Sequence, residues 1–472
     1  MEILKEYLEK FIKYDSGEEI SKFANYSFLK DRLPIFECSD KTLEEIYYFR
    51  AYTLMKHIRK DRNGKYIVTE FSVPVSWAED TEGAISCAVG HHLAELGWIS
   101  GMENIVKEYI EFWFEHKENL LLYNNWFAYA VYRYALLRGE MDYAYSVVDK
   151  LIKCFEELEK RHRAQCGLYK SVDNYDGMEY SISASGIRCT INSYVYANAY
   201  AIYKILAYKS DARAEKYCRF SKKLKTRINC KLFKNDFYYN AELSRGETLN
   251  LFNREFSNPN ADKSVKEEAG FIPFYFKIAG KKQLSALRFL TDETVFSLPF
   301  GIATADCRHE QFMRENGHMC LWNGPVWPFA TSQTLRGVIE TIRKYESVSP
   351  VGAKDFCKML QTYANSQYIV IDGVKRPWID ENLDGRTGEW LARKIMKETG
   401  NPGAERGKDY NHSTFLDLVI GGLCGAGTER GKVKFKPLIS EDITSFSLKN
   451  LRIAGKTYEL TYSSGKFCVT EK

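Results

Sequence analysis

The sequence predicts a mainly helical protein, built as a toroid or solenoid of helix pairs and followed by a short antiparallel β segment. Apolar residues recur at helical spacing through most of the chain, in about a dozen separate stretches. Many of these stretches are joined by short connections, which are typical of antiparallel helix pairs. The chain contains no sequence repeat of fixed period, and this favours a toroid over a solenoid.

The helices can be placed along the chain from their apolar faces. The chain starts with an amphipathic helix that carries acidic residues, and the next helix follows Asp40, with Thr42 and Glu45 expected to form its capping box. Further helices are expected near residues 84–99, 101–117, 124–138, 141–160, 191–208, 211–227, 263–278, 326–345, 353–366 and 412–424.

Three segments depart from the helical pattern. Residues 232–252 are expected to be extended, and residues 368–376 to form a hairpin around Asp372-Gly373, a strong turn signal. From Val433 onward apolar and polar residues alternate, as in paired strands. This tail of about 40 residues is too small to fold alone, so we expect it to pack on the helical body.

Composition and charge restrict the possible partners. The net charge of +5 comes from 67 basic and 62 acidic residues with no basic run, which argues against nucleic acid. The start lacks the features of a secretory signal, and no apolar run is long enough to span a bilayer, so we expect a cytoplasmic protein without a membrane partner. Twelve cysteines without C-x-x-C spacing indicate reduced thiols; no metal or other cofactor is expected, and the oligomeric state stays open.

Four polar and aromatic loops interrupt the helices, at residues 72–80, 173–188, 314–328 and 378–390. Each places tryptophan or tyrosine beside carboxylates, asparagine or arginine. Aromatic faces stack on sugar rings while planar polar groups bind hydroxyls, and loops on a rigid scaffold commonly carry such groups. The loops therefore predict a small carbohydrate as the substrate.

The loops also resemble the motifs of a known family. Trp322–Pro328 resembles the W-x-G-P-x-W-P signature of α/α-barrel glycoside hydrolases, the mannosylglycerate-hydrolase-like proteins and glycoside hydrolase family 63. Asp176–Ser181 is similar to the segment that carries the general acid in that group, and Glu381–Gly388 to the segment whose leading glutamate is the general base. Trp77–Asp80 resembles an early W-D motif of the same group less closely.

This resemblance implies a fold and a domain organisation. The fold would be an (α/α)6 barrel, a six-hairpin toroid, over residues 41–428. Residues 1–40 would be a leader segment packed on the barrel, and residues 429–472 a C-terminal β-strand segment.

The resemblance further implies inverting hydrolysis of an α-glycosidic bond, with Glu179 as the acid and Glu381 as the carboxylate that activates water. Glu179 stands where the family usually has Asp, and Asp176 where it has Ser, so Asp176 stays the second candidate for the acid. The two carboxyl groups of an inverting enzyme lie roughly 6.5–9.5 Å apart. The acid needs a raised pKa, which an aromatic, water-poor pocket supplies.

The other polar and aromatic residues of the loops are candidates for substrate contact. Each also has a structural interpretation: the tryptophans as core residues, Arg188 as an ion-pair partner of Glu179, and Asp80 as a helix cap. The predicted contact residues are Trp77, Asp80, Trp126, Asp176, Arg188, Trp322, Asn323, Trp327, Trp390 and His412.

Other functions fit the same kind of scaffold. A sugar-binding protein keeps the tryptophans but has no need of the Glu381 loop. A sugar epimerase needs paired histidines, for which His318 and His412 are suitably placed. A phosphorylase needs a basic and hydroxyl-rich cluster facing the base, and the sequence provides no evident one.

Overall fold

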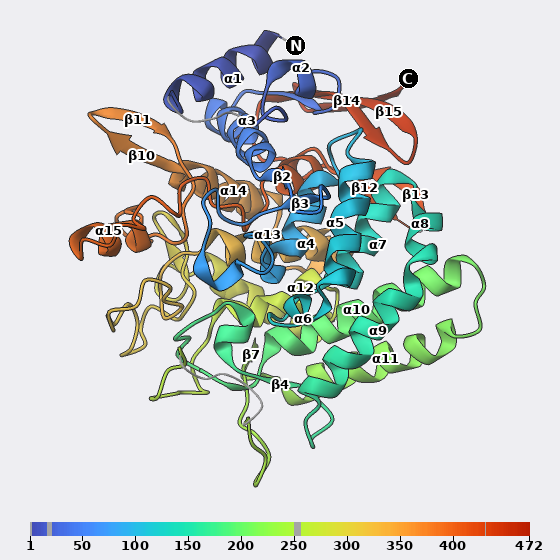
Figure 1. The fold of residues 1–472 in the computed structure, drawn as a ribbon, viewed down its shortest axis with the longest axis vertical. Coiled ribbons are helices and arrows are strands. Elements are labelled where there is room, and N and C mark those ends of the chain that lie inside the picture. The colour runs from blue at the N-terminus through green and yellow to red at the C-terminus, as the bar shows by residue number, and fades with distance from the viewer. Residues whose placement is uncertain (1, 17–20, 250–255, 430) are drawn as a thin grey trace.

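The computed structural model describes residues 2–16, 21–249, 256–429 and 431–472, and it is mainly helical with antiparallel strands at its C-terminal end (Figure 1). Its helices are α1 (Glu2–Tyr14), α2 (Tyr26–Leu29), α3 (Lys41–Lys56), α4 (Val89–Leu96), α5 (Glu103–Glu115), α6 (Lys117–Leu120), α7 (Phe127–Arg138), α8 (Met141–Ser146), α9 (Val148–His162), α10 (Cys189–Tyr208), α11 (Ala214–Lys231), α12 (Ile272–Tyr275), α13 (Pro328–Tyr345), α14 (Ala353–Ser366), α15 (Leu391–Glu398) and α16 (Leu416–Leu418). Its strands are β1 (Ile35–Cys38), β2 (Ile58–Lys60), β3 (Tyr66–Val68), β4 (Lys170–Ser171), β5 (Gly186–Ile187), β6 (Phe233–Lys234), β7 (Phe237–Tyr238), β8 (Ser297–Leu298), β9 (Gly301–Ile302), β10 (Tyr368–Ile371), β11 (Val374–Pro377), β12 (Ala426–Glu429), β13 (Lys432–Phe435), β14 (Ser445–Ile453), β15 (Lys456–Ser463) and β16 (Lys466–Glu471).

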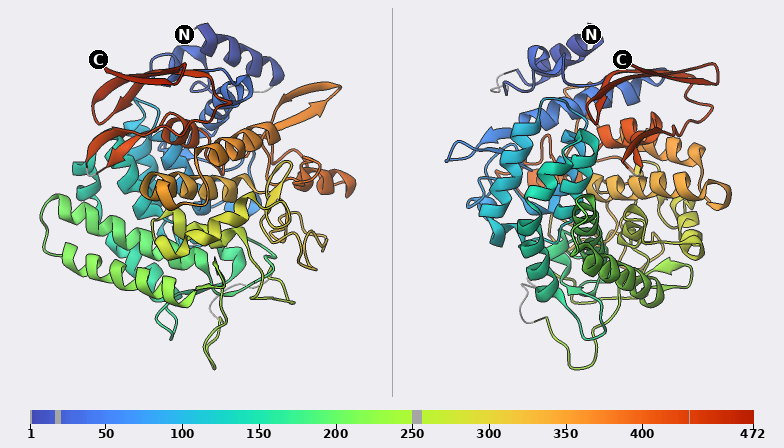
Figure 2. Two further views of the ribbon diagram at one scale, coloured as in Figure 1. Left: turned by 180° about the vertical axis from the view of Figure 1, so that it is seen from behind. Right: turned by 90° about the vertical axis from the view of Figure 1, so that its right-hand side faces the viewer.

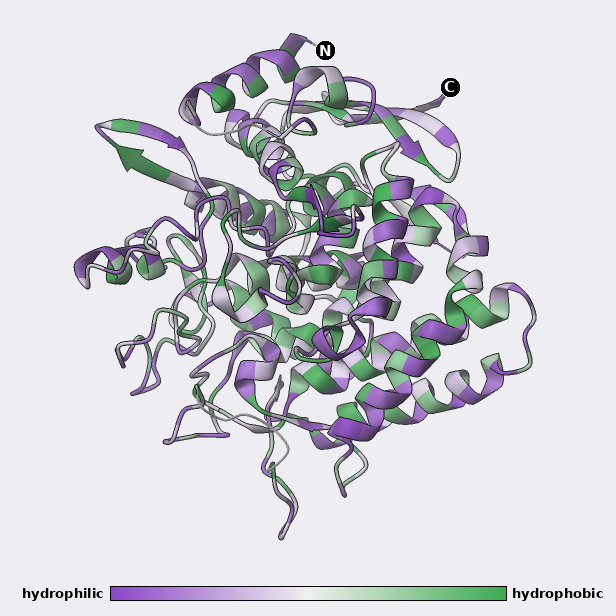
Figure 3. Ribbon diagram, viewed as in Figure 1, coloured by the Kyte–Doolittle hydropathy of each residue, from purple (hydrophilic) through white to green (hydrophobic). Residues whose placement is uncertain are grey.

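The position of a helix follows from its apolar pattern. Helix α9 buries Leu151, Phe155 and Leu158 along one face and exposes charged residues on the other, so it lies at the surface. Helix α10 is buried on nearly all sides and accordingly lies between α7, α9 and α11. Most helices carry both hydrophilic and hydrophobic stretches (Figure 3), as expected for helices that pack on one side.

The packing of the helices follows a closed path. Helix α4 packs on α7, α7 on α10, α10 on α12, and α12 on α13, while α13 and α4 both contact α16. Helices α9 and α11 cover α10, and α14 covers α13 (Figure 2). The contact between α4 and α16 is fixed by Glu95, whose carboxylate accepts hydrogen bonds from the backbone N–H groups of Phe415 (3.0 Å) and Asp417 (2.8 Å). These groups lie at the start of α16, where they have no partners within the helix.

The C-terminal strands form a sheet with a strand from the beginning of the chain. The order is β1-β14-β15-β16, and every neighbouring pair is antiparallel. Leu448 lies opposite Phe36 on one side and Leu460 on the other, and all three side chains are buried. Both ends of the chain consequently lie at the same end of the molecule (Figure 2).

Most of the predicted elements are present. The hairpin around Asp372-Gly373 is confirmed by β10 and β11, and the alternating tail by β13 to β16. The single helix expected at 263–278 is wrong: a short 3-10 turn and α12 take its place, because Glu267 forms a β-bridge with Ala305. The segment 232–252 contains the small β6–β7 hairpin, and its last three residues lie outside the described residues.

The capping box expected at the start of α3 is also wrong. Asp40 is the N-cap, and its carboxylate accepts hydrogen bonds from the backbone N–H groups of Thr42 (3.0 Å) and Leu43 (3.1 Å). Glu45 instead accepts a hydrogen bond from the hydroxyl of Tyr368, 2.7 Å away.

The described residues contain no helix that is long and apolar enough to cross a membrane. All twelve cysteines are free thiols, and more than half of them are buried.

We predict that Gly90→Ala destabilises the fold, because a Cβ atom at this position of α4 would lie 2.0 Å from Cε2 of Trp126. Such overpacking costs about 1–3 kcal/mol, measured as the free energy of unfolding in urea. Gly97→Ala is the control, since its Cβ would meet the flexible Cδ1 of Leu137 at 3.2 Å. Equal stability of the two variants would contradict the tight packing of Trp126 on α4.

Candidate active site

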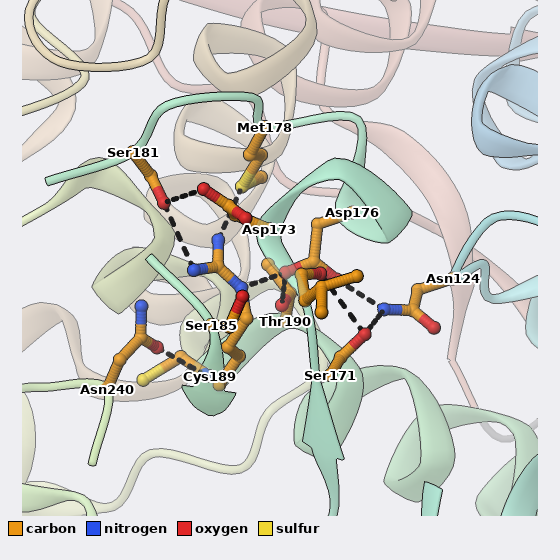
Figure 4. Close-up of polar contacts among 12 residues, drawn as sticks. Asn124, Ser171, Asp173, Asp176, Met178, Ser181, Ser185, Cys189, Thr190 and Asn240 are labelled. Atoms are coloured by element: carbon orange, nitrogen blue, oxygen red, sulfur yellow. Dashed lines mark hydrogen bonds and ion pairs between the residues drawn. The ribbon is translucent and has the colours of Figure 1, made fainter. Parts of the chain in front are cut away.

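A buried ion pair holds the loop that carries Glu179. The guanidinium Nε of Arg188 donates to Oδ2 of Asp176, and both side chains are completely buried (Figure 4). Nη1 of Arg188 donates to the hydroxyl of Ser181 (3.1 Å) and to the carbonyl of Ala184. The ion pair therefore fixes both ends of the short segment that includes Glu179.

Asp176 has further partners that occupy its remaining lone pairs. Thr190 donates its hydroxyl to Oδ2, and Asn124 donates an amide N–H to Oδ1 at 2.5 Å (Figure 4). Asp176 is therefore held inside the protein by these partners. The contact of Asp176 and Arg188 with substrate stays a prediction, as does the place of Asp176 as the second candidate for the acid.

Glu179 lies beyond this anchor and remains partly exposed, although many atoms surround its carboxyl group. Burial raises the pKa of Glu179 to about 8. The negative charges of Asp173, Glu381 and Glu70 contribute to this rise, and a backbone hydrogen bond opposes it. Glu179 therefore holds its proton at neutral pH, as a general acid must.

Glu381 follows β11 and is almost completely buried. Its Oε1 accepts a hydrogen bond from Nε of Arg406 (3.0 Å), and its Oε2 accepts one from the thiol of Cys320 (3.1 Å). The preceding Asp380 accepts a hydrogen bond from the backbone N–H of Glu381 at 2.8 Å, and burial raises the pKa of Asp380 to about 7. Glu381 is accordingly an ion-paired carboxylate on a firmly held backbone.

A third carboxyl group, Glu70, lies just after β3 and was not predicted. It accepts hydrogen bonds from the hydroxyl of Tyr410 and, at 3.4 Å, from the thiol of Cys87. The pKa of Glu70 is raised to about 7, mainly by burial and to a smaller extent by the charge of Glu381. Glu70, Glu179 and Glu381 thus form one electrostatic cluster, which we call the carboxylate cluster.

Backbone contacts join the loops that surround the carboxylate cluster. The N–H of Trp322 donates to the carbonyl of Glu179 at 3.0 Å, and Val326 and Leu383 exchange two hydrogen bonds of 2.9 and 3.0 Å. The loop of the tryptophan motif is therefore tied to the loop of each predicted catalytic glutamate.

Aromatic rings border the carboxylate cluster. The exposed Trp77 (48% accessible) lies beneath the guanidinium of Arg406, 5.1 Å from its ring centre. Trp322 and Trp327 stack with their centres 4.5 Å apart, and Trp327 contacts His412. Trp77 hence offers a ring to solvent close to Glu381, whereas the Trp322–Trp327 stack lies deeper.

Unpartnered polar atoms surround Phe329 at the base of this region. Among the described residues, the indole Nε1 of Trp322, Nε2 of His412 and both ring nitrogens of His91 have no hydrogen-bond partner. The rings of all three residues lie within 6.3 Å of the ring of Phe329. Buried polar groups normally find partners, so these atoms are free to contact a polar ligand.

Four other predicted contact residues do not face the cluster. Trp126 is fully buried against Tyr194 in the helical core. The amide N–H groups of Asn323 donate hydrogen bonds to backbone carbonyls. The indole N–H of Trp390 donates a hydrogen bond to the backbone carbonyl of Tyr368. Asp80 is exposed, and no contact joins it to the cluster in the described parts of the chain. Their assignment as substrate contacts is not supported by these positions.

The sequence contained weak signals for the residues that were missed. Glu70 comes two residues before the polar loop at 72–80, and Arg406 lies in a glycine-rich stretch before Tyr410. Neither belongs to a motif, and only folding brings them to Glu381. The described residues contain no group of three or more His, Cys, Asp or Glu side chains arranged to hold a metal ion.

Carboxyl groups beside an arginine and aromatic rings, at one end of a helical body, are typical of enzymes that cleave glycosidic bonds. The sequence matches the mannosylglycerate hydrolase MGH1-like glycoside hydrolase domain over residues 81–413. The chain belongs to this family, as its motifs predicted.

Three solved structures have a similar fold. A protein described as a sialidase has a TM-score of 0.86 and 28% identity, over 99% of this chain and 43% of its own. An α-L-rhamnosidase from Dictyoglumus thermophilum has a TM-score of 0.55 and 13% identity over 93% of this chain and 44% of its own. The family 63 mannosylglycerate hydrolase from Thermus thermophilus has a TM-score of 0.51 and 12% identity, over 75% of this chain and 99% of its own.

The last two likenesses concern the fold alone. The chain spans less than half the length of the first two proteins. The sequence has no match among curated proteins.

We predict that Asp176→Ala lowers the free energy of unfolding by about 3–5 kcal/mol, because it leaves the buried charge of Arg188 without its partner. Urea unfolding measures this loss. Asp80→Ala is the control, since this exposed carboxylate should change stability by no more than about 0.5 kcal/mol. A wild-type unfolding midpoint for Asp176→Ala would show that the ion pair does not hold the loop.

Proposed function

We propose that the protein is an inverting glycoside hydrolase that cleaves an α-glycosidic bond in a small oligosaccharide or glycoside. The observation that carries the proposal is the difference between two carboxyl groups of one cluster. Glu179 keeps its proton because of burial and neighbouring negative charge, whereas Glu381 is paired with Arg406. Carboxyl groups whose surroundings separate their protonation in this way are suited to act as an acid and a base.

The proposed reaction uses each group once. Glu179 donates its proton to the departing glycosidic oxygen while the bond from that oxygen to the anomeric carbon breaks. Glu381 accepts a proton from a water molecule, whose oxygen forms the new bond on the opposite face of the sugar. The products are a sugar of inverted anomeric configuration and a free alcohol.

We propose Glu70 as a positioning residue for this reaction. We assign neither catalytic role to it, because Glu70 belongs to neither motif and pairs with no cation among the described residues, whereas Glu381 pairs with Arg406. Its negative charge favours the protonated form of Glu179. Glu70 also accepts a hydrogen bond from the backbone N–H of Asn411 (2.9 Å), through its own carbonyl, and so holds the segment that contains His412.

The scaffold that we propose is a six-hairpin toroid, the (α/α)6 barrel, over residues 41–428. The closed packing path through α4, α7, α10, α12, α13 and α16 supports it, with α9, α11 and α14 on the outside. Residues 1–40 and 429–472 are proposed as the leader and the β segment, and the pairing of β1 with β14 supports treating them as neighbours.

The substrate is proposed to be a small carbohydrate that enters past Trp77. This exposed indole offers a face for a sugar ring. The unpartnered indole nitrogen of Trp322 can donate a hydrogen bond to a sugar hydroxyl, and the unpartnered ring nitrogen of His412 can donate or accept one. The proposal requires no cofactor, nucleic acid or membrane, and a cytoplasmic location remains an expectation.

Sugar binding without catalysis and sugar epimerisation are the alternatives. Epimerisation would use His318 and His412 as a pair, yet the two rings have different neighbours, Tyr180 for His318 (5.2 Å) and Tyr410 for His412 (3.9 Å). A binding protein has no use for a carboxyl group whose pKa is raised to about 8. Hydrolysis therefore accounts for more of the site.

We expect Glu381→Gln to lower turnover by about two to four orders of magnitude without unfolding the protein, because water loses its base. A panel of aryl α-glycosides provides the assay, and proton NMR identifies the first anomer released. Glu389→Gln is the control, an exposed glutamate of the same loop that pairs with Lys394. Release of the β-anomer from an α-linked substrate supports inversion, whereas release of the α-anomer refutes it.

The role of Glu179 as the general acid is tested with substrates that differ in their leaving group. Glu179→Gln should retain more activity on dinitrophenyl glycosides than on unactivated disaccharides, because a good leaving group departs without protonation. Equal losses on both substrates would rule out an acid role for Glu179.

The pH profile should have an alkaline limb near pH 8. An acid acts only while protonated, so activity is present below the pKa of Glu179, about 8, and lost as the pH rises through it. In Glu70→Gln one negative charge is removed from the cluster, and the limb should move to lower pH. An unchanged limb would mean that Glu70 does not act on Glu179.

A further inference from the structure

A deep cleft lies at the opposite end of the helical body from the carboxylate cluster. Helix α13 begins at Pro328, next to Trp327, and its last turn reaches the cleft with Arg343 and Lys344. Its 18 residues span about 27 Å at 1.5 Å per residue. The cleft has a volume of about 1010 Å³ and shares no lining residue with the cluster.

The lining of the cleft is strongly basic. Nine lysine and arginine side chains line it, against two glutamates, Glu340 and Glu429. Glu340 pairs with Arg336 (2.5 Å) and with Lys277 (2.7 Å), and the nearby Asp417 pairs with Arg133 and Arg336. The carboxylates present are therefore already used by some of these cations.

Several cations of the cleft have no carboxylate partner in the described parts of the chain. Nζ of Lys225 donates to the backbone carbonyl of Lys277 at 2.6 Å, and Arg343 donates to the carbonyl of Gly421. Lys204 and Lys344 likewise form no ion pair with any described carboxylate. The Nε atoms of Arg336 and Arg343 are buried without a hydrogen-bond partner.

Burial and mutual repulsion act on these charges. The pKa of Lys225 is lowered to about 8, mainly by burial and to a smaller extent by the charge of Lys344. Burial likewise lowers the pKa of Arg343 to about 10, with a contribution from Arg336. A negatively charged ligand would relieve both effects, since an opposite charge stabilises the protonated form.

Tyrosines line the same cleft between the cations. Tyr132 and Tyr200 are partly buried and Tyr208 is exposed, so their rings form part of its surface. Flat aromatic faces bind the apolar faces of sugar rings. A cleft of this volume is at the upper end of the range for small-molecule sites, far larger than a single phosphate or sulfate ion needs.

We propose that the cleft is a second binding site, which takes an anionic oligosaccharide whose sugar units carry carboxylate or sulfate groups. The lysines and Arg343 would bind the charged groups, and the tyrosines would contact the rings. This site is separate from the carboxylate cluster, and its existence does not depend on the reaction proposed there.

Calorimetric titration of the whole chain tests the proposal with trigalacturonate and a trisulfated disaccharide as probes. We expect at least one probe to bind, with an affinity that falls as salt is raised. Galactotriose is the control for binding through sugar rings alone, and inorganic sulfate is the control for binding through charge alone. A poly-glutamate peptide is the control for binding of any acidic polymer. Binding of neither anionic sugar overturns the proposal, and so does binding of any control as tightly as the better probe.

The double variant Lys225→Gln/Lys344→Gln should weaken binding at least tenfold. Lys222→Gln/Lys223→Gln is the matched control, because these exposed lysines lie on α11 outside the cleft and the net charge changes equally. Lys204→Gln is a second, milder variant in the cleft that should weaken binding severalfold. Equal affinity of the cleft and control variants would overturn the assignment.

Glu381→Gln separates this site from the active site. It should bind the anionic sugar as the wild type does, whatever its effect on hydrolysis. Loss of binding in Glu381→Gln would place the ligand at the carboxylate cluster and refute a second site.

Discussion

The carboxylate cluster depends on one buried ion pair, that of Asp176 with Arg188. Burying two charges costs more than their attraction returns unless other hydrogen bonds satisfy the remaining groups. Here Thr190 and Asn124 donate hydrogen bonds to Asp176. Ser181 and Ala184 accept hydrogen bonds from Arg188. The network orders a loop without regular secondary structure, so that Glu179 has a defined position beside Glu381.

The protonation of the cluster is a property of the whole group. Three carboxyl groups share a poorly solvated region with one nearby guanidinium, that of Arg406. Like charges disfavour each other's ionisation. Glu381 forms the ion pair with Arg406, and its negative charge favours the protonated forms of Glu70 and Glu179. The raised pKa of Glu179 follows from its burial first and from this distribution of charge second.

Sequence reasoning predicted the helical body, the β tail and the family because these rest on periodicity and on contiguous motifs. It also selected Glu179 and Glu381, whose motifs are local, although their roles stay predictions. It kept Asp176 as a second candidate for the acid, because spacing along a loop does not reveal that this side chain turns inward to Arg188. It missed Glu70, whose hydroxyl partner Tyr410 is 340 residues away in the chain. Long-range pairings of this kind leave no mark on the local pattern.

The tryptophans could not be sorted from the sequence for a similar reason. Trp77 and Trp126 are both aromatic residues beside polar ones in the sequence, yet one is exposed and the other is fully buried. The difference arises from Gly90, which lets Trp126 approach α4 closely. A glycine on a neighbouring helix cannot be matched to its tryptophan before the helices are paired in space.

The cap that Glu95 provides for α16 has a consequence for biosynthesis. The backbone N–H of Phe415, which donates to Glu95, is synthesised 320 residues later. The separation between β1 and its partner strand β14 is longer still. At about 5–20 residues per second, the early helices spend on the order of 15 to 60 seconds without these contacts. Until then the carboxylate of Glu95 stays hydrated, and the final closure of this part of the molecule takes place only after α16 and β14 have been made.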